Sequence, residues 1–197
     1  VDLVELGVDH DGRPDLERLR DVVDPGTLLV STMLANNENG AITAVESIRA
    51  VAHEVGALLH VDASQAVGRV PLDVGALGVD LLTFSSHKLG GPRGAGALWI
   101  RRGLELAPVL HGGPQERERR AGTENLLAAV GFAAASEEAV ARRTEMGDRV
   151  APLRDRLWSG LEARVPFLDR DIVSNHNPTH SPIPNLNLTL PITLSPT

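Results

Sequence analysis

The sequence predicts an α/β protein built on a mostly parallel sheet, and three observations support this prediction. Four apolar segments have the length of strands, stretches of helical composition alternate with them, and no internal repeat is present. Strands alternating with helices favour parallel pairing. Continuous apolar runs are typical of strands buried in such a sheet. We therefore expect three layers, with the sheet flanked by helices on both faces.

The first half of the chain alternates predicted strands and helices. Residues 1–9 alternate apolar and polar side chains, as a half-buried strand does. Pro14 suits the start of a helix because a proline in the first turn loses no helical hydrogen bond. The expected elements are a strand over 1–9, a turn over 10–13, a short helix over 15–23, a strand buried on both faces over 27–34, and a helix over 44–55.

Three further strands are expected in the middle of the chain, over 57–61, 79–84 and 95–100. The sequence changes character after Gly122. There we expect helices over 123–143 and 147–164 and a strand-like segment over 185–190. Thr123 is placed to cap the first of these helices, with Glu124 in its first turn. We expect residues 1–140 to belong to a large domain. Residues 141–197 would form a helical connection and the incomplete start of a small α+β domain.

Composition excludes several classes of function. The 197 residues carry a net charge of −7 with both signs interspersed, so no basic face favours nucleic acid as a partner. The chain has no cysteine, and hence no disulfide, thiolate metal site or thiol nucleophile. Neither a signal peptide nor an apolar run of membrane-spanning length is evident. The sequence alone therefore favours a cytoplasmic protein without a membrane span.

The segment over residues 81–100 is the most informative one for chemistry. An apolar strand leads to Ser85, His87 and Lys88, and a glycine-rich turn follows. Ligands of open α/β sheets gather at the carboxyl ends of strands. A lysine there can form a Schiff base with an aldehyde cofactor if its pKa is lowered, and Ser85 and His87 can donate hydrogen bonds to a phosphate. The simpler interpretation is a lysine in a surface loop.

A second segment, residues 60–68, also ends a strand with polar side chains. Asp62 at a strand end can pair with a protonated pyridine nitrogen, and Gln65 lies close enough in sequence to reach the same ligand. Alternatively, Asp62 caps the turn that follows. A metal site at His60 and Asp62 is a weaker interpretation, because no third ligand is evident nearby.

Two further segments place polar groups next to glycines. Asn36, Asn37 and Glu38 follow a strand and precede Gly40, which is also what an ordinary turn requires. Residues 111–125 hold several arginines and end in Gly-Thr-Glu-Asn. These arginines form either a solvated face or part of an anion site at the start of a helix.

Together, the four segments resemble the cysteine desulfurase family, within the class V aminotransferase-like enzymes. The matching motifs are Asn-Asn-Glu-x-Gly at 36–40, Asp-Ala-x-Gln at 62–65, Ser-x-His-Lys at 85–88 and Arg-x-Gly-Thr-Glu-Asn at 120–125. Their order and spacing match as well as their content. The resemblance implies the large domain of a fold type I pyridoxal-phosphate enzyme.

The resemblance implies a role for each matching residue. Lys88 would be the catalytic residue that forms a Schiff base with pyridoxal 5'-phosphate and moves protons on the substrate carbon. Asp62 would keep the pyridine nitrogen protonated. The remaining cofactor contacts would be Gln65 at the phenolic oxygen with Asn36 or Asn37 nearby (Asn37 is favoured), Ser85 and His87 at the phosphate, and Thr123 at the phosphate of a partner subunit. The last contact implies a homodimer.

Departures from the family pattern indicate a fragment. The family's stacking histidine belongs upstream of this sequence, and its substrate arginine and sulfur-accepting cysteine belong downstream. Without a cysteine, the chain cannot form the persulfide itself. The expected reaction converts L-cysteine to L-alanine, with sulfur passing to an acceptor such as a protein.

Three alternatives stay open. One is selenocysteine lyase or another class V enzyme, whose substrate would be selenocysteine or another small amino acid instead of cysteine. Another is a non-catalytic dimerisation or scaffold domain. A nucleotide site at the glycines of residues 90–96 is disfavoured because they lack the regular dinucleotide spacing.

Overall fold

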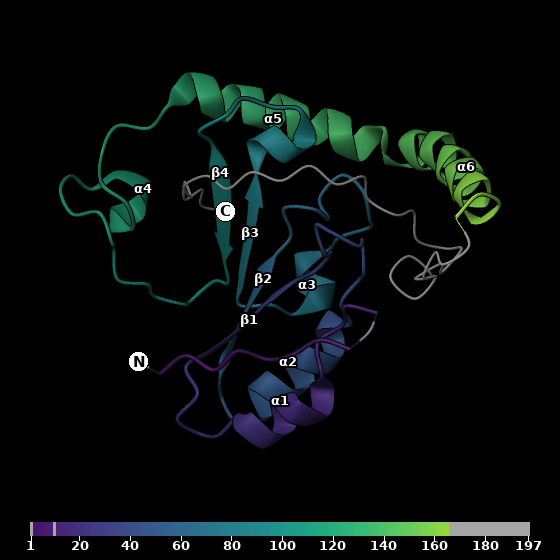
Figure 1. Ribbon diagram of the computed structural model, residues 1–197. Helices are drawn as coiled ribbons and strands as arrows, with labels where there is room; N and C mark the ends of the chain where they lie inside the picture. The colour runs from purple at the N-terminus through teal and green to yellow at the C-terminus, as the bar shows by residue number, and fades with distance from the viewer. Residues whose placement is uncertain (1, 10, 166–197) are drawn as a thin grey trace.

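The centre of the molecule is a four-stranded sheet with the strand order β1-β2-β3-β4 (Figure 1). The computed structural model describes residues 2–9 and 11–165. The strands are β1 (Leu29–Met33), β2 (Leu58–Asp62), β3 (Leu81–Ser85) and β4 (Gly96–Ile100). The first three run parallel, and β4 pairs antiparallel with β3. The prediction of a mostly parallel sheet flanked by helices is confirmed.

Three helices belong to the connections before and between the parallel strands. They are α1 (Leu16–Val22) before β1, α2 (Val45–Glu54) between β1 and β2, and α3 (Val74–Leu77) between β2 and β3. Asp15 caps α1, because its side chain accepts hydrogen bonds from the amides of Glu17 and Arg18. Parallel strands need such crossover connections, since a tight turn cannot join them.

The core lies between the sheet and α2. Helix α2 contributes Val45, Ile48 and Val51 to the core, at the spacing of one helical face. Leu59 and Val61 of β2 are fully buried against that face, and burying a leucine contributes about 1.5 to 3 kcal/mol. The prediction that residues 27–34 are buried on both faces is wrong for the described chain. In β1 burial alternates, with Leu29 46% exposed, because the helices of the core cover only one face of that strand.

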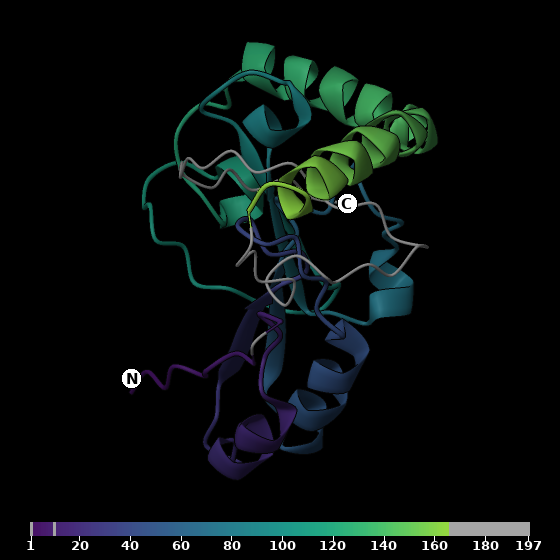
Figure 2. The ribbon, with the colours of Figure 1, turned by 45° about the vertical axis from the view of Figure 1, so that its right-hand side comes forward.

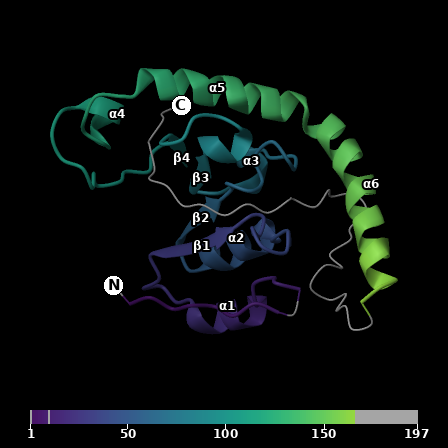
Figure 3. The same cartoon turned by 45° about the horizontal axis from the view of Figure 1, so that its top comes forward.

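The remaining helices follow β3 and β4. They are the 3₁₀ helix η1 (Ser86–Leu89), α4 (Gln115–Glu118), α5 (Leu126–Ala141) and α6 (Arg143–Glu162). The ring of Phe132 on α5 lies 5.1 Å from that of Phe84 on β3, so α5 packs against the end of the sheet that leads into η1. Figures 2 and 3 show α6 turning away from the axis of α5.

Two predicted elements differ from the structure. No strand forms over residues 2–9, where the described chain makes only an isolated bridge from Val8 to Pro14. Leu3 is 85% exposed, and an alternating pattern without a partner strand does not make a strand. Thr123 does not cap α5. Asn125 does so instead, accepting a hydrogen bond from the amide of Ala128 at 3.1 Å.

The boundaries of the later elements also shift. Helix α6 begins at Arg143, earlier than the predicted 147, and Arg142 joins it to α5 through ion pairs with Glu138 and Glu145. The short elements α3, η1 and α4 were not predicted. The strand-like segment over 185–190 lies outside the described residues.

Asp80 ties together the amino-terminal edge of the parallel strands. Its carboxylate accepts hydrogen bonds from the amide of Leu59 at 2.8 Å, from His53 Nε2 at 2.9 Å and from Arg101 Nε at 2.6 Å. Asp80 is only 2% exposed, and burial alone would raise its pKa. The three donors outweigh burial and lower the pKa of Asp80, so the network joins α2, β2, β3 and the end of β4 around an ionised carboxylate.

Candidate functional site

The carboxyl ends of β1, β2 and β3 lie at one edge of the sheet. Beyond the strands, the Leu34 amide donates to the Asp62 carbonyl at 2.9 Å, and the Ala63 amide donates to the Thr83 carbonyl at 2.8 Å. These bonds keep the three chain segments side by side as they leave the sheet. The strand ends and the segments after them contain six of the seven predicted site residues: Asn37, Asp62, Gln65, Ser85, His87 and Lys88. The sheet therefore gathers the motifs that the sequence separates.

Lys88 lies in η1, directly beyond β3. Gly90 ends this 3₁₀ helix with φ +83°, a left-handed conformation that glycine adopts without strain. Lys88 is half-buried, and burial lowers the pKa of its ammonium group. The nearby charge of Arg69 lowers the pKa of Lys88 further, whereas Asp62 opposes both effects. A lysine in such a place has a larger share of neutral amine than a solvated one.

His87 and Ser86 bury polar atoms that make no hydrogen bond within the described residues. Both ring nitrogens of His87 and the hydroxyl of Ser86 are in this state. Such atoms are rare in folded proteins because each one forfeits its bonds to water. Ser85, by contrast, is only partly buried, and its side chain does not cap η1. The start of η1 thus contains donors and acceptors suited to a ligand.

Asp62 and Gln65 occupy the segment after β2. One carboxylate oxygen of Asp62, Oδ1, accepts a hydrogen bond from the Ser64 amide at 2.8 Å. The alternative that Asp62 caps the following turn is therefore confirmed for that oxygen. Gln65 is 5% exposed, which is unusual for a glutamine. The weaker metal interpretation gains no support, because the described residues contain no cluster of three or more metal-ligating side chains.

The two asparagines after β1 differ in what their side chains do. Asn36 Oδ1 accepts hydrogen bonds from the amides of Glu38 at 2.7 Å and Asn39 at 3.3 Å. Asn36 also exchanges backbone bonds with Ala41 and Gly40, so it builds the turn. The turn chemistry weighed from the sequence is therefore correct for Asn36. Asn37 stays the predicted ligand contact.

Thr123, the seventh predicted residue, is exposed and lies in the long connection between β4 and α5. Figure 1 shows α4, in the same connection, standing off the β4 edge of the sheet. Gln115 Oε1 accepts a hydrogen bond from the Gly122 amide at 3.1 Å, which closes the connection into a loop. Within that loop Glu116, Arg117 and Glu118 all have positive φ, a strained conformation for residues other than glycine.

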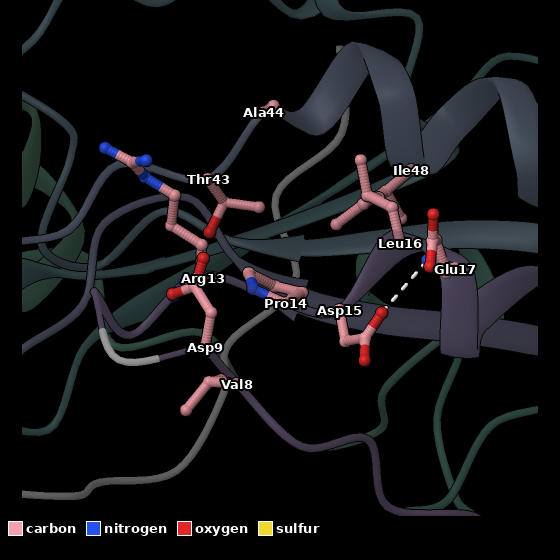
Figure 4. Close-up of a pocket in the computed structure, with 10 residues that line it drawn as sticks. All are labelled: Val8, Asp9, Arg13, Pro14, Asp15, Leu16, Glu17, Thr43, Ala44 and Ile48. Atoms are coloured by element: carbon pink, nitrogen blue, oxygen red, sulfur yellow. Dashed lines mark hydrogen bonds between the residues drawn. The ribbon is translucent and has the colours of Figure 1, made fainter.

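A hollow of about 360 Å³ lies elsewhere, between the turn at Asp9 and the first residues of α1 and α2 (Figure 4). Its acidic groups already bind their own backbone. Asp9 accepts hydrogen bonds from the amides of Asp11 and Arg13, and Asp15 caps α1. None of the seven predicted site residues lines this hollow, so we place the site at the carboxyl edge of the sheet instead.

Sequence reasoning missed Arg69, which donates a hydrogen bond from Nη2 to the Lys88 carbonyl at 2.8 Å. The available signal was a basic residue directly after Gly68, at the end of the segment that begins with Asp62. Its contact with Lys88 joins residues 19 apart in sequence. No spacing rule could have predicted that contact.

Among the described helices, none is long and apolar enough to cross a bilayer.

Comparisons with known proteins agree with this arrangement. The aminotransferase class-V family model matches residues 1–170. A cysteine desulfurase of Gluconacetobacter diazotrophicus is 49% identical over 160 residues, which are 81% of this chain and 40% of that protein. The solved structure of a NifS-like protein superposes with a TM-score of 0.76 at 41% identity, covering 80% of this chain and 44% of the other.

A structure described as SspA in complex with cysteine superposes with a TM-score of 0.66 at 35% identity, covering 69% of this chain and 40% of that one. The chain thus spans less than half the length of the proteins it matches. The matches confirm the fold and the resemblance that the four motifs suggested. The chain belongs to the aminotransferase class-V family.

Proposed function

We propose that this chain is the cofactor-binding portion of a pyridoxal-phosphate-dependent cysteine desulfurase. One observation supports this most directly. His87 buries two ring nitrogens that find no hydrogen-bond partner in the described part of the chain, next to a lysine whose pKa is lowered by burial and by a neighbouring cation. Perturbed titratable groups beside unsatisfied polar atoms are typical of ligand sites. The named relatives support the choice of activity.

The residues at the carboxyl edge fit the chemical groups of pyridoxal phosphate. Ser85 and His87 offer an O–H and an N–H donor for a phosphate, and the ring nitrogens of His87 are buried without a hydrogen-bond partner among the described residues. Asp62 offers a carboxylate for the protonated pyridine nitrogen. Gln65 and Asn37 offer amides for the phenolic oxygen, and the use of Asn36 in its own turn favours Asn37.

Lys88 has two tasks in the proposed reaction. Its neutral amine would hold the cofactor at the aldehyde carbon, and burial and the adjacent Arg69 favour this amine by disfavouring the ammonium form. The same amine would hold and move a proton at the substrate carbon. When bound, pyridoxal phosphate supplies the electron sink for that carbon.

The proposed net reaction passes the sulfur of L-cysteine to a thiol acceptor and leaves L-alanine. The C–S bond of cysteine breaks, and a persulfide S–S bond forms on the acceptor. The carbon that has lost the sulfur gains the proton of the acceptor thiol and becomes the methyl group of alanine. The described SspA complex contains cysteine, which supports this substrate class. Because this sequence has no cysteine, the acceptor thiol must come from outside it.

A homodimer with shared sites fits the surface of α5. This helix has apolar side chains around its whole circumference, including Leu127, which is 87% exposed, and Val130. A helix of that kind is usually buried. We propose that a second copy covers it and that Thr123, exposed just before α5, reaches the phosphate in the partner's site. Analytical ultracentrifugation of Leu127→Glu should give monomers where the parent gives dimers.

The cofactor proposal is tested by titrating the purified chain with pyridoxal phosphate and following visible absorption. Lys88 is the only lysine in the sequence, so borohydride reduction should fix the cofactor to one internal peptide, identified by mass spectrometry. Lys88→Ala should lose both the saturable absorption band and the labelled peptide. A folded parent chain that gives neither signal would refute the cofactor site.

Turnover distinguishes the desulfurase from the two remaining alternatives. Alanine formation should be measured with L-cysteine and with L-selenocysteine, in the presence of a thiol acceptor, on the whole protein that contains this chain. Faster reaction with cysteine supports the proposal, and preference for selenocysteine supports a lyase. Cofactor binding without any alanine would support the non-catalytic domain.

A further inference from the structure

Arg69 lies behind Lys88 because of how the segment after β2 packs. Gly68 has φ +71°, and a Cβ atom there would come within 2.7 Å of the Cβ of Ala139 on α5. Only glycine allows this approach, which brings the chain close to α5 and directs the next residue towards η1. Arg69 Nη2 then donates to the Lys88 carbonyl at 2.8 Å. The guanidinium of Arg69 is therefore hydrogen-bonded to the main chain of Lys88, the only lysine in the sequence.

The guanidinium of Arg69 has no compensating anion in the described part of the chain. It is half-buried, burial lowers the pKa of Arg69, and no carboxylate forms an ion pair with it there. Its Nη1 atom is buried without a hydrogen-bond partner. A partly buried and unpaired cation costs stability, so its place beside another cation requires an explanation.

The charged groups around Lys88 come from three segments. Asp62 at the end of β2 attracts the ammonium group, Arg69 after β2 repels it, and His87 is its neighbour in η1. Helix α5, which packs on η1, presents uncharged side chains to this region: Phe132, Ala135 and Ala139. Of the two described charges that shift the pKa of Lys88, Arg69 disfavours its protonated form and Asp62 favours it.

We propose that Arg69 is a positioning residue for Lys88. Arg69 holds the backbone of Lys88 through the Lys88 carbonyl and keeps more of the lysine amine unprotonated. This role rests on the proposed function, in which the neutral amine of Lys88 binds the cofactor. The direction of the Lys88 pKa shift supports the same role, since the charge of Arg69 contributes to it after burial. A free amine reacts and accepts protons, whereas an ammonium does neither.

Competitive acetylation tests this role without cofactor or turnover. The cofactor-free full chain is treated with trace acetic anhydride over a range of pH, and acetylation of the peptide containing Lys88 is quantified by mass spectrometry. Near neutral pH, Arg69→Gln should react roughly three- to tenfold more slowly, because removing a neighbouring cation raises the pKa of Lys88 and reduces its free-amine fraction. Arg69→Lys, which keeps the charge, should stay close to the parent.

A matched control removes the same charge elsewhere. Arg102→Gln changes an exposed arginine beyond the other end of β4 and should leave the acetylation profile of Lys88 unchanged. Circular dichroism verifies that each variant is folded. If Arg69→Gln does not fold, Arg69→Met, which keeps the aliphatic stem, takes its place.

An Arg69→Gln profile that coincides with the parent's would overturn the inference, and so would an equal slowing in Arg69→Lys, which would assign the effect to packing rather than charge. Either result leaves the cofactor proposal standing, because that proposal depends on the separate titration with pyridoxal phosphate. A chain that binds no cofactor but shows the expected acetylation profiles would refute only the proposed function.

Discussion

The two edges of the sheet treat buried polar atoms in opposite ways. At the amino edge, both carboxylate oxygens of Asp80 accept hydrogen bonds, from Leu59, His53 and Arg101. At the carboxyl edge, buried atoms of Arg69, Ser86 and His87 make none. In the part of the chain that the structure describes, these three residues supply four of the five buried side-chain polar atoms without a hydrogen-bond partner, and the fifth is Nε of Arg49.

This difference separates stability from binding. A satisfied buried carboxylate holds the strand ends in register, whereas an unsatisfied buried donor costs free energy in the absence of a ligand. The hydrogen-bonded amino edge therefore stabilises the fold, whereas the carboxyl edge with Lys88 contains the site that we propose for the cofactor. The Asp80 and His87 variants below each change one edge and leave the other intact.

Removing the carboxylate at the amino edge should have the largest effect. Asp80→Ala leaves the Leu59 amide, His53 and Arg101 without their acceptor, and should lower the free energy of unfolding by about 3 kcal/mol. Urea denaturation measures this loss. Asp73→Ala, which removes the exposed cap of α3, is the control and should cost about 1 kcal/mol. Equal losses in the two variants would contradict the special role of the amino edge.

Acid should weaken the same network by a smaller amount. The folded pKa of Asp80 is lowered, so its contribution is complete above the unfolded value of about 3.9 and disappears as the pH falls through the folded value. The unfolding free energy of the parent should therefore decrease below about pH 4. Asp80→Asn should show a flatter acid limb in that window. Parallel acid limbs in the two proteins would show that Asp80 is not the group responsible.

At the carboxyl edge, stability and binding should respond in opposite directions. His87→Phe replaces an unsatisfied ring with an apolar one, so the unfolding free energy of the cofactor-free chain should change by less than about 1 kcal/mol. Affinity for pyridoxal phosphate should fall about tenfold or more, because a donor to the phosphate is lost. Parallel urea and absorption titrations test both parts. A large loss of stability would make His87 an ordinary core residue.

The smallest effect should come from relieving backbone strain between β4 and α5. Glu118 has φ +65°, a conformation that costs a residue with a Cβ roughly 1 kcal/mol. Glu118→Gly should raise the unfolding free energy by about 0.5 kcal/mol, since glycine also gains freedom in the unfolded chain. Combined with Asp80→Ala, the two effects should add, because the residues lie in separate parts of the fold. A destabilised Glu118→Gly would argue against strain in this loop.

Local patterns explain what the sequence predicted well. Strands β2, β3 and β4 were predicted within two residues because each is an apolar run bounded by polar or glycine residues. The gathering of Asp62, Ser85 and His87 at one edge followed from parallel pairing, which the alternation of strands and helices already indicated. Their roles towards a cofactor stay predictions until the titration is done.

The errors came where the outcome depended on distant partners. Residues 1–9 have an alternating pattern, but no strand pairs with the described part of it. Burial of β1 on both faces was predicted from its apolar run, although exposure is decided by what packs on each face. Capping of α5 by Asn125 rather than Thr123 depends on where the loop that begins at Gln115 ends.

By itself, the sequence determined the four strands of the sheet, its longer helices and the motif residues at the carboxyl edge, because hydrophobic periodicity and turn residues act over a few positions. Only the tertiary structure decided which of the polar groups are satisfied. Asp80 meets His53 and Arg101, residues 27 and 21 positions away, and Arg69 meets Lys88 across 19. Burial and hydrogen bonding depend on such contacts between distant segments, and these contacts distinguish the stabilising edge of the sheet from the edge prepared for a ligand.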